Sequence, residues 1–294
     1  MAETWMSAKR YQQVTRVAFF ALYAIIVTGS LVRLTGSGLG CSDWPNCNNE
    51  KFVDVSSGHA AIEQINRLFT GFVALSVVVA VSGALVMQPR RPRLVRCALL
   101  LVMGVLAQVI LGAYVVLTGL NPWSNMAHFL VSVVLVTAAF VLVKRVDGLI
   151  HGPHVLSNHD VILRQFILGA ISLAVLMGTV VTGAGPHSGA ELVTRIDIPV
   201  RFATQLHSGA VWLSVFLATA YVVRVRRSTS RWTTEGPAAM RLIGLLMLQG
   251  FIGYVQYFAG VPAQLVAIHV ALSVAVFLTA FSIFLPTSTL TVLD

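Results

Sequence analysis

Two polar positions occur twice along the chain at one fixed spacing. His128 and His269 are 141 residues apart, and the same distance separates Asn66 from His207. Each of the four lies a few residues inside a long apolar run. Because an ionisable or polar side chain in such surroundings is costly, it indicates a functional site by default. The spacing therefore predicts two related sites.

The pair His207 and His269 suggests metal chemistry. Two imidazoles that face each other in an apolar helical bundle are typical ligands of a haem iron. Zinc would need further ligands, and a proton relay would need carboxylates in line. A single histidine could simply bond a neighbouring helix, but two repeat-related histidines at one depth favour a bis-histidine haem.

The other pair, His128 and Asn66, is unequal. An amide is a poor iron ligand compared with imidazole, so we expect iron to be held weakly or from one side, with an open coordination position for oxygen chemistry. Glu63 projects from a similar helix face as Asn66. An ion pair with Arg67 or Arg33 is one interpretation of Glu63, and a proton donor or acceptor beside the iron is the other. We favour the second.

The elements that must position these residues are apolar runs. The 294 residues are 56% hydrophobic and only 11% charged. A hydrocarbon core of about 30 Å is crossed by about 20 helical residues, and lipid tolerates no unpaired backbone. We therefore predict an all-α integral membrane protein, in contact with lipid, with eight transmembrane helices. They lie near residues 16–35, 60–87, 94–118, 124–143, 163–183, 203–223, 240–259 and 263–285.

Basic residues predict the orientation. They gather at the N-terminus and in alternate connections, at 88–96, 144–145 and 224–231, which should face the cytoplasm. The prediction is a multi-pass protein of the cell membrane with both termini cytoplasmic and the haem sites toward the outer leaflet. The net charge of +9 then reflects topology, so we expect no nucleic-acid partner.

Three arginines stand near predicted outer helix ends. Arg33, Arg67 and Arg201 are placed where guanidinium groups would pair with haem propionates. For Arg201, a side chain that simply reaches the membrane surface is an equal alternative.

The chain reads as a duplicated four-helix unit. Residues 108–119 match 249–260 at the 141-residue offset, which predicts two pseudo-symmetric four-helix bundles related by an axis along the membrane normal. We assign 1–147 to the first repeat, 148–162 to a cytoplasmic linker and 163–294 to the second repeat. The first copy has about six extra residues between its first two helices, in the segment that holds Cys41 and Cys47.

Cys41 and Cys47 fall in the predicted outer connection. A disulfide persists in such an oxidising compartment, and we favour a loop staple over a redox-active pair. Two cysteines without further nearby ligands disfavour zinc.

The sequence resembles the haem A synthase family over essentially its whole length. The specific segment is VRLTGSGLGCSDWPNC, and the shorter ones are EQINR, MAHF, QLHSG and AIHV. The resemblance implies two four-helix bundles that oxidise the C8 methyl of haem O to a formyl group, giving haem A for cytochrome oxidase. It places haem b on His207 and His269 and the substrate haem in the N-terminal half with His128. Implied partners are haem O synthase, cytochrome oxidase assembly factors and an electron donor that no motif identifies.

One residue departs from the family pattern. The family commonly has ExxHR where this chain has ExxNR, so Asn66 replaces a histidine that would share the substrate iron. We interpret this as a tolerated variant because Glu63, Arg67 and His128 remain. A b-type electron-transfer cytochrome and a haem transporter are the alternatives. The inequality of the two sites disfavours the electron-transfer cytochrome. A transporter should have broken helices near the membrane midplane, whereas the polar residues here are predicted in the outer leaflet, so the transporter is also disfavoured.

Overall fold

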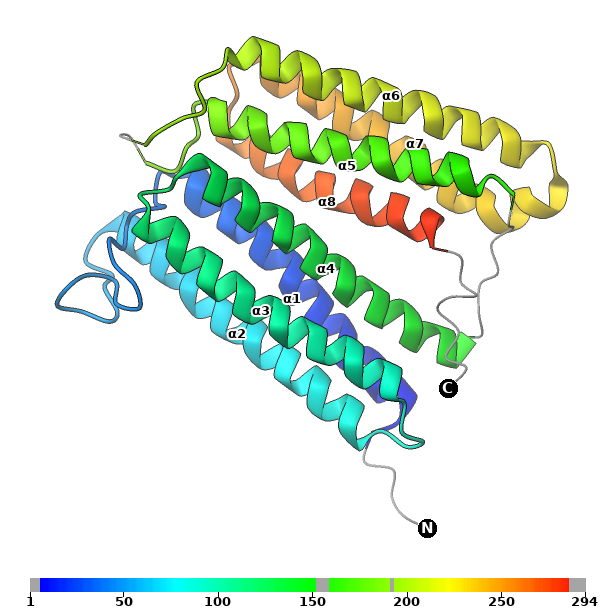
Figure 1. Ribbon diagram of the computed structural model, residues 1–294, viewed down its shortest axis with the longest axis horizontal. Coiled ribbons are helices and arrows are strands. Elements are labelled where there is room, and N and C mark those ends of the chain that lie inside the picture. The colour runs from blue at the N-terminus through cyan, green and yellow to red at the C-terminus, as the bar shows by residue number, and fades with distance from the viewer. Residues whose placement is uncertain (1–5, 152–158, 191–192, 286–294) are drawn as a thin grey trace. The chain divides into compact units, whose positions relative to one another are not determined.

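The computed structural model describes residues 6–151, 159–190 and 193–285. These residues form eight helices and no strand (Figure 1). The helices are α1 (Ala8–Leu34), α2 (Gly58–Val86), α3 (Pro92–Leu117), α4 (Pro122–His151), α5 (Val161–Ala184), α6 (Val200–Arg226), α7 (Thr229–Phe258) and α8 (Ala263–Phe284).

Each of the eight helices in the described residues is long and apolar enough to cross a membrane. The predicted all-α membrane architecture with eight spans is thus confirmed. Three helices extend well beyond their apolar runs, since α1 begins at Ala8, α4 continues to His151 and α7 begins at Thr229. The Ser228 hydroxyl accepts the backbone N–H of Arg231, which caps the polar start of α7 and lets the helix form there. Part of the predicted linker 148–162 is therefore helical, and its residues 152–158, with His154, lie outside the described residues.

The chain divides into two compact units. Within the described residues, the first comprises 6–151 with 188–190 and 193–194, and the second comprises 159–187 and 195–285. The segment beginning at Ser188 follows α5 in sequence, but it belongs to the first unit because the Gly38 N–H donates to the Gly189 carbonyl at 2.9 Å.

Each unit is a ring of four helices. In the first, α1 packs against α2 and α4, and α3 packs against the same two helices. In the second, α5 and α7 each pack against α6 and α8. The pairs α2 with α4 and α6 with α8 therefore lie on the diagonals, and the predicted haem-site residues are on these diagonal helices.

The connections that lead into α4 and α8 have the same backbone conformation. Gly119 and Leu120 have φ of 62° and 59°, and Gly260 and Val261 have φ of 77° and 61°. A left-handed residue after a helix, most often glycine, lets the chain turn sharply there. His128 stands eight residues after Leu120, and His269 stands eight after Val261, so the two histidines hold equivalent places in their helices.

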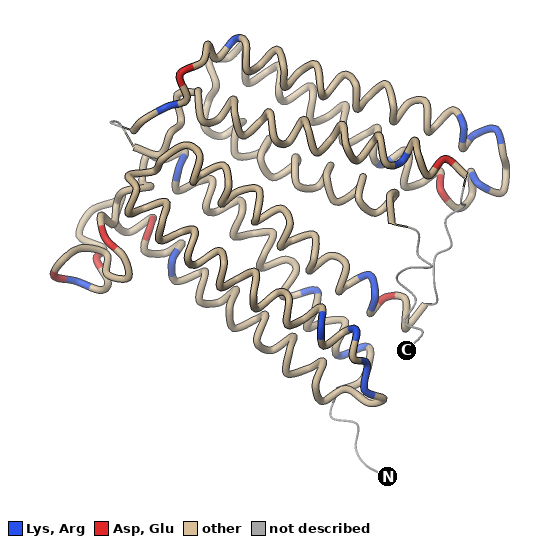
Figure 2. The backbone as a smooth tube through the Cα atoms, in the orientation of Figure 1, with Lys and Arg blue, Asp and Glu red and all other residues tan. Residues whose placement is uncertain are grey.

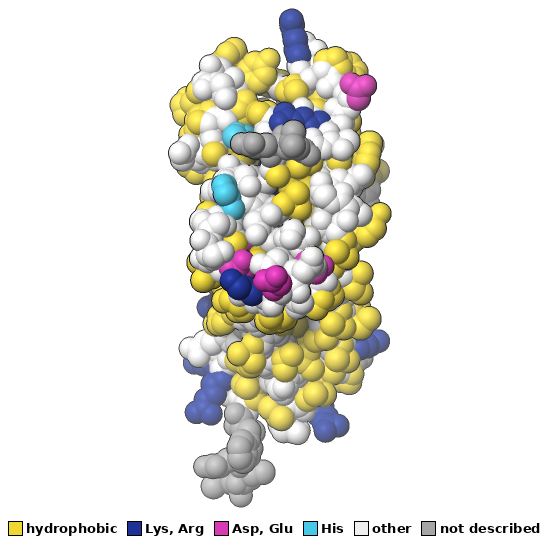
Figure 3. All heavy atoms as spheres, turned by 90° about the vertical axis from the view of Figure 1, so that its left-hand side faces the viewer, with side chains coloured by type: hydrophobic (Ala, Val, Ile, Leu, Met, Phe, Trp, Pro, Cys, Tyr) yellow, Lys and Arg dark blue, Asp and Glu magenta, His cyan; other side chains and the backbone are white. Residues whose placement is uncertain are grey.

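The charged side chains are unevenly distributed. In the first unit, most Lys and Arg gather at the end where α1 begins and α2 ends, whereas the acidic residues of the 35–57 loop lie at the other end (Figure 2). Figure 3 looks onto one face of the molecule, where hydrophobic side chains cover much of the visible surface and charged side chains gather in a few places. This pattern is that of helices with lipid-facing flanks and polar ends.

Candidate functional site

The second unit brings two histidines together across its diagonal. His207 lies on α6 and His269 on α8, and their ring centroids are 6.2 Å apart with an angle of 68° between the rings. In the described residues these two helices are not in direct backbone contact. The imidazoles therefore meet in the interior of the four-helix ring.

The His207 ring is oriented by a hydrogen bond to α5. Its Nδ1 lies 2.8 Å from the Ala174 carbonyl oxygen. Because a carbonyl only accepts, Nδ1 carries the proton and Nε2 keeps its lone pair. Metal-binding histidines commonly use their second ring nitrogen in this way.

Glycines make room for both rings. A Cβ on Gly178 would lie 3.3 Å from Cε1 of His207, and a Cβ on Gly253 would lie 3.1 Å from Cε1 of His269. Both distances are shorter than a normal carbon–carbon contact. Glycine at these two positions lets each imidazole approach the helix beside it.

The residues of the second unit fit a bis-histidine haem. The two rings are close enough for both to bind one metal ion, because metal–nitrogen bonds are about 2.0–2.1 Å long. The observed centroid separation is 6.2 Å. In addition, Nδ1 of His269 is buried and has no hydrogen-bond partner among the described residues.

The first unit contains the related pair His128 on α4 and Asn66 on α2. Gln108 Nε2 donates to the His128 carbonyl at 3.1 Å, and Gln249 Nε2 donates to the His269 carbonyl at 2.9 Å, so both helices are held alike. The two units differ at the second residue of the pair, which is Asn66 in the first unit and His207 in the second. Asn66 Oδ1 accepts a hydrogen bond of 2.8 Å from the hydroxyl of Thr28 on α1.

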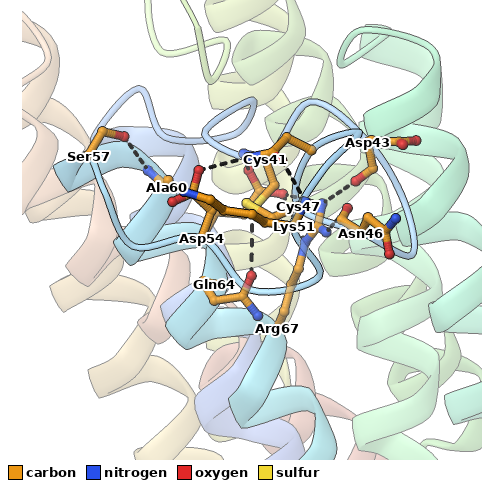
Figure 4. Close-up of a disulfide and its surroundings, with 12 residues drawn as sticks. Cys41, Asp43, Asn46, Cys47, Lys51, Asp54, Ser57, Ala60, Gln64 and Arg67 are labelled. Atoms are coloured by element: carbon orange, nitrogen blue, oxygen red, sulfur yellow. Dashed lines mark hydrogen bonds and ion pairs between the residues drawn. A yellow bond between two sulfur atoms is a disulfide. The ribbon is translucent and has the colours of Figure 1, made fainter.

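Arg67 lies on α2 and reaches the 35–57 loop (Figure 4). Glu63, one turn earlier on α2, contacts both Arg67 and this loop. Glu63 Oε1 accepts from Nη2 and Nε of Arg67 at 2.8 and 3.1 Å, and its Oε2 accepts the backbone N–H of Cys41 at 2.8 Å. Arg67 also donates to the carbonyls of Asp43 and Asn46, each at 3.1 Å. Glu63 and Arg67 therefore anchor the loop to α2. An ion pair with Arg67 was one of the two interpretations that the sequence allowed for Glu63.

A disulfide joins Cys41 and Cys47 and closes a small ring in the 35–57 loop. Both cysteines are almost fully buried and pack on Ala60 in the first turns of α2. The predicted disulfide is present, and its ring contains the two carbonyls that Arg67 binds.

Asp54 orders the rest of this loop. Its carboxylate accepts the Ser56 N–H at 3.0 Å and the side-chain amide of Asn48 at 2.7 Å. The pKa of Asp54 is lowered from its usual value, first by the Ser56 N–H and then by the Ser56 hydroxyl, the charge of Lys51 and the Asn48 amide.

Comparison with known families identifies the chain. A family model described as "Cytochrome oxidase assembly protein" (COX15-CtaA) matches residues 12–58 and 51–194, together more than half of the chain. The chain belongs to the haem A synthase family. The match covers α2 to α5 and all but the first residues of α1, while His207 and His269 lie beyond it.

Individual haem A synthases are similar over shorter stretches. The "Heme A synthase" of Geobacillus thermodenitrificans is 31% identical over 106 residues, which are 36% of this chain and 33% of that protein. The "Heme A synthase" of Listeria welshimeri is 28% identical over 130 residues, or 43% of this chain and 42% of that protein. The chain thus spans between a third and two fifths of the length of these relatives.

The structure separates the predicted site residues of this haem A synthase family member into groups. His207 lies beside His269 in one group. In the other group, Glu63 lies beside Arg67 and the disulfide ring. Arg33 lies in the last turn of α1, and Arg201 is exposed in the first turn of α6.

Sequence reasoning missed the contacts that hold these groups. It did not find Thr28, the glycines beside the rings or the action of Gln108 and Gln249 on the histidine carbonyls. The two glutamines recur at the 141-residue offset, and that recurrence was the available signal.

Proposed function

We propose that the protein is a haem A synthase that oxidises the C8 methyl of haem O to a formyl group and so supplies haem A for cytochrome oxidase. The observation that carries this proposal is the inequality of the two diagonals. One has two imidazoles at 6.2 Å, while the other has one imidazole and an amide already bonded to Thr28. Family membership agrees with the proposal.

The two units have different tasks in this account. His207 and His269 hold a permanent haem b, which supplies one-electron chemistry when bound. The first unit binds haem O as substrate, and His128 is its protein ligand. Arg67 and Arg33 are the cations proposed for the haem O propionates.

The chemistry proposed for the substrate is two hydroxylations of one carbon, with dioxygen as the oxidant. Each replaces a C–H bond by C–OH, and two electrons and two protons reduce the second oxygen atom to water. The second hydroxylation gives a geminal diol, which loses one water to become the aldehyde. The electrons come from an external donor through the second unit.

Glu63 is the residue proposed to handle protons. Its carboxylate accepts two hydrogen bonds at Oε1 from Arg67 and backbone N–H bonds from Cys41 and Gly40. We propose that this carboxylate, on the same helix as Asn66, exchanges protons with the substrate. Arg67 keeps the carboxylate in place for that task.

We further infer that the basic ends of both units face the cytoplasm and that the sites lie in the outer leaflet. The N-terminal basic residues and the 88–96 stretch support this orientation.

The test is the haem composition of membranes from cells that supply haem O and make no haem A of their own. Expression of the intact protein should produce haem A, and Glu63→Ala and His128→Ala should produce little or none. Arg16→Ala, at the opposite end of the first unit, is the matched control and should behave as the intact protein. Haem b bound without any haem A would refute the proposed activity.

A further inference from the structure

Asn66 has a restricted set of chemical roles. The amide has one atom with available lone pairs, Oδ1, and its NH2 group only donates. Oδ1 is engaged by the Thr28 hydroxyl at 2.8 Å. The same hydroxyl lies 3.4 Å from the Ile25 carbonyl, a much longer contact, so its proton belongs to the bond with Asn66.

The orientation of the amide follows from that bond. With Oδ1 turned to α1, the Nδ2 donors of Asn66 point away from α1. Among the described residues, no protein acceptor binds them. Asn66 is half-buried, and its repeat counterpart His207 meets His269 inside the four-helix ring.

The helix beside this residue also differs between the two units. His207 fits beside α5 because Gly178 leaves space for it. When the LTGSG and VTGAG segments are aligned, the α1 residue that matches Gly178 is Leu31. The first unit thus has no glycine at the position that accommodates the His207 ring in the second unit.

We propose that Asn66 is a hydrogen-bond donor beside an open iron coordination position, and that the first unit consequently binds small exogenous ligands such as cyanide. The inference rests on the proposed function, because it requires a haem held by His128. Thr28 is the positioning residue that turns the amide so that its donors face the ligand. The second unit, with two imidazoles on its iron, takes no such ligand.

The experiment is a cyanide titration of the purified, haem-loaded, oxidised full-length protein, followed by absorption spectroscopy. The intact protein should show a high-spin ferric component and bind one cyanide per chain. Asn66→Leu removes both donors at similar volume and should weaken cyanide binding about two- to tenfold, the worth of one hydrogen bond. Thr28→Val should shift the affinity in the same direction, and Thr28→Ser, which keeps the hydroxyl, should leave it unchanged.

Two controls separate the possible failures. The low-spin signal assigned to His207 and His269 reports in every variant that the protein is folded and loaded. His128→Ala should remove the cyanide-binding haem and leave that signal.

Each contrary outcome has a defined meaning. If His128→Ala loses that haem but Asn66→Leu binds cyanide as tightly as the intact protein, the role of Asn66 is refuted and the proposed function stands. If the first-unit haem is low-spin and takes no cyanide, the open position is refuted. If His128→Ala changes neither haem content nor spectrum, the proposed function fails together with this inference.

Discussion

The guanidinium of Arg67 and the carboxylate of Glu63, one turn apart on α2, are joined by two hydrogen bonds of 2.8 and 3.1 Å. The Glu63 side chain is 7% exposed and that of Arg67 is 20% exposed. Arg67 continues from this pair to the carbonyls of Asp43 and Asn46 in the disulfide ring. One ion pair thus connects the first turns of α2 to the 35–57 loop.

Arg67→Gln should destabilise the first unit strongly. It leaves the Glu63 carboxylate shielded from water without its cation and should lower the free energy of unfolding by about 3 kcal/mol. Unfolding in detergent with increasing denaturant measures this. Arg16→Gln is the control, because it breaks an ion pair with Asp147 in which Arg16 is 47% exposed, and should cost less than about 1 kcal/mol. Equal losses in the two variants would contradict the anchoring role of Arg67.

Loss of the disulfide should act on the same loop. Cys41→Ser combined with Cys47→Ser should lower the free energy of unfolding by about 2 kcal/mol, the lower end of the usual range because the closed ring is short. Adding Arg67→Gln should cost less than the sum of the separate effects, since both changes release one loop. Strict additivity of the two losses would show that Arg67 and the ring act independently.

Gly253→Ala should disturb the haem site of the second unit. The new methyl group would lie 3.1 Å from Cε1 of His269, and such overpacking costs about 1–3 kcal/mol. We therefore expect the affinity of the protein for the low-spin haem to fall by about fivefold or more. Gly112→Ala is the matched control, because its methyl group would meet His128 at an ordinary 3.5 Å and should leave the low-spin signal intact. Unchanged haem retention in Gly253→Ala would contradict the tight placement of His269.

Asp54 should add an acid-sensitive contribution to loop stability. Its pKa is lowered in the folded protein, so its contribution is present above the carboxyl group's ordinary value of 3.8 and is lost as pH falls through the folded value. Asp54→Asn should therefore lower the unfolding temperature at neutral pH, and the difference from the intact protein should disappear as the pH falls through the lowered pKa of Asp54. A difference that stays constant across that range would exclude an effect of the carboxylate charge.

Much of the architecture could be predicted from the sequence. The apolar runs located all eight helices because lipid demands long uninterrupted hydrophobic segments. The helix ends were harder to predict. α7 begins at Thr229 rather than near 240, because a capping serine and the i,i+4 ion pair of Arg231 with Glu235 support polar turns that hydropathy does not reveal.

The site could be predicted only in part. Repetition at 141 residues revealed His128, His207 and His269, since repeated polar residues in apolar runs stand out. The partners of Arg67 did not stand out, because backbone carbonyls in a loop have no sequence signature. The pairing of Glu63 with Arg67 rather than Arg33 agrees with the i,i+4 spacing of the two residues on α2.

The most direct test of the central claim, that the two units hold haem differently, is the haem extract of the purified full-length protein from cells that supply haem O. The account predicts about one haem b per chain, retained on His207 and His269, together with haem O or haem A that is lost in His128→Ala. Two equivalents of tightly bound haem b per chain would contradict it and indicate an electron-transfer cytochrome.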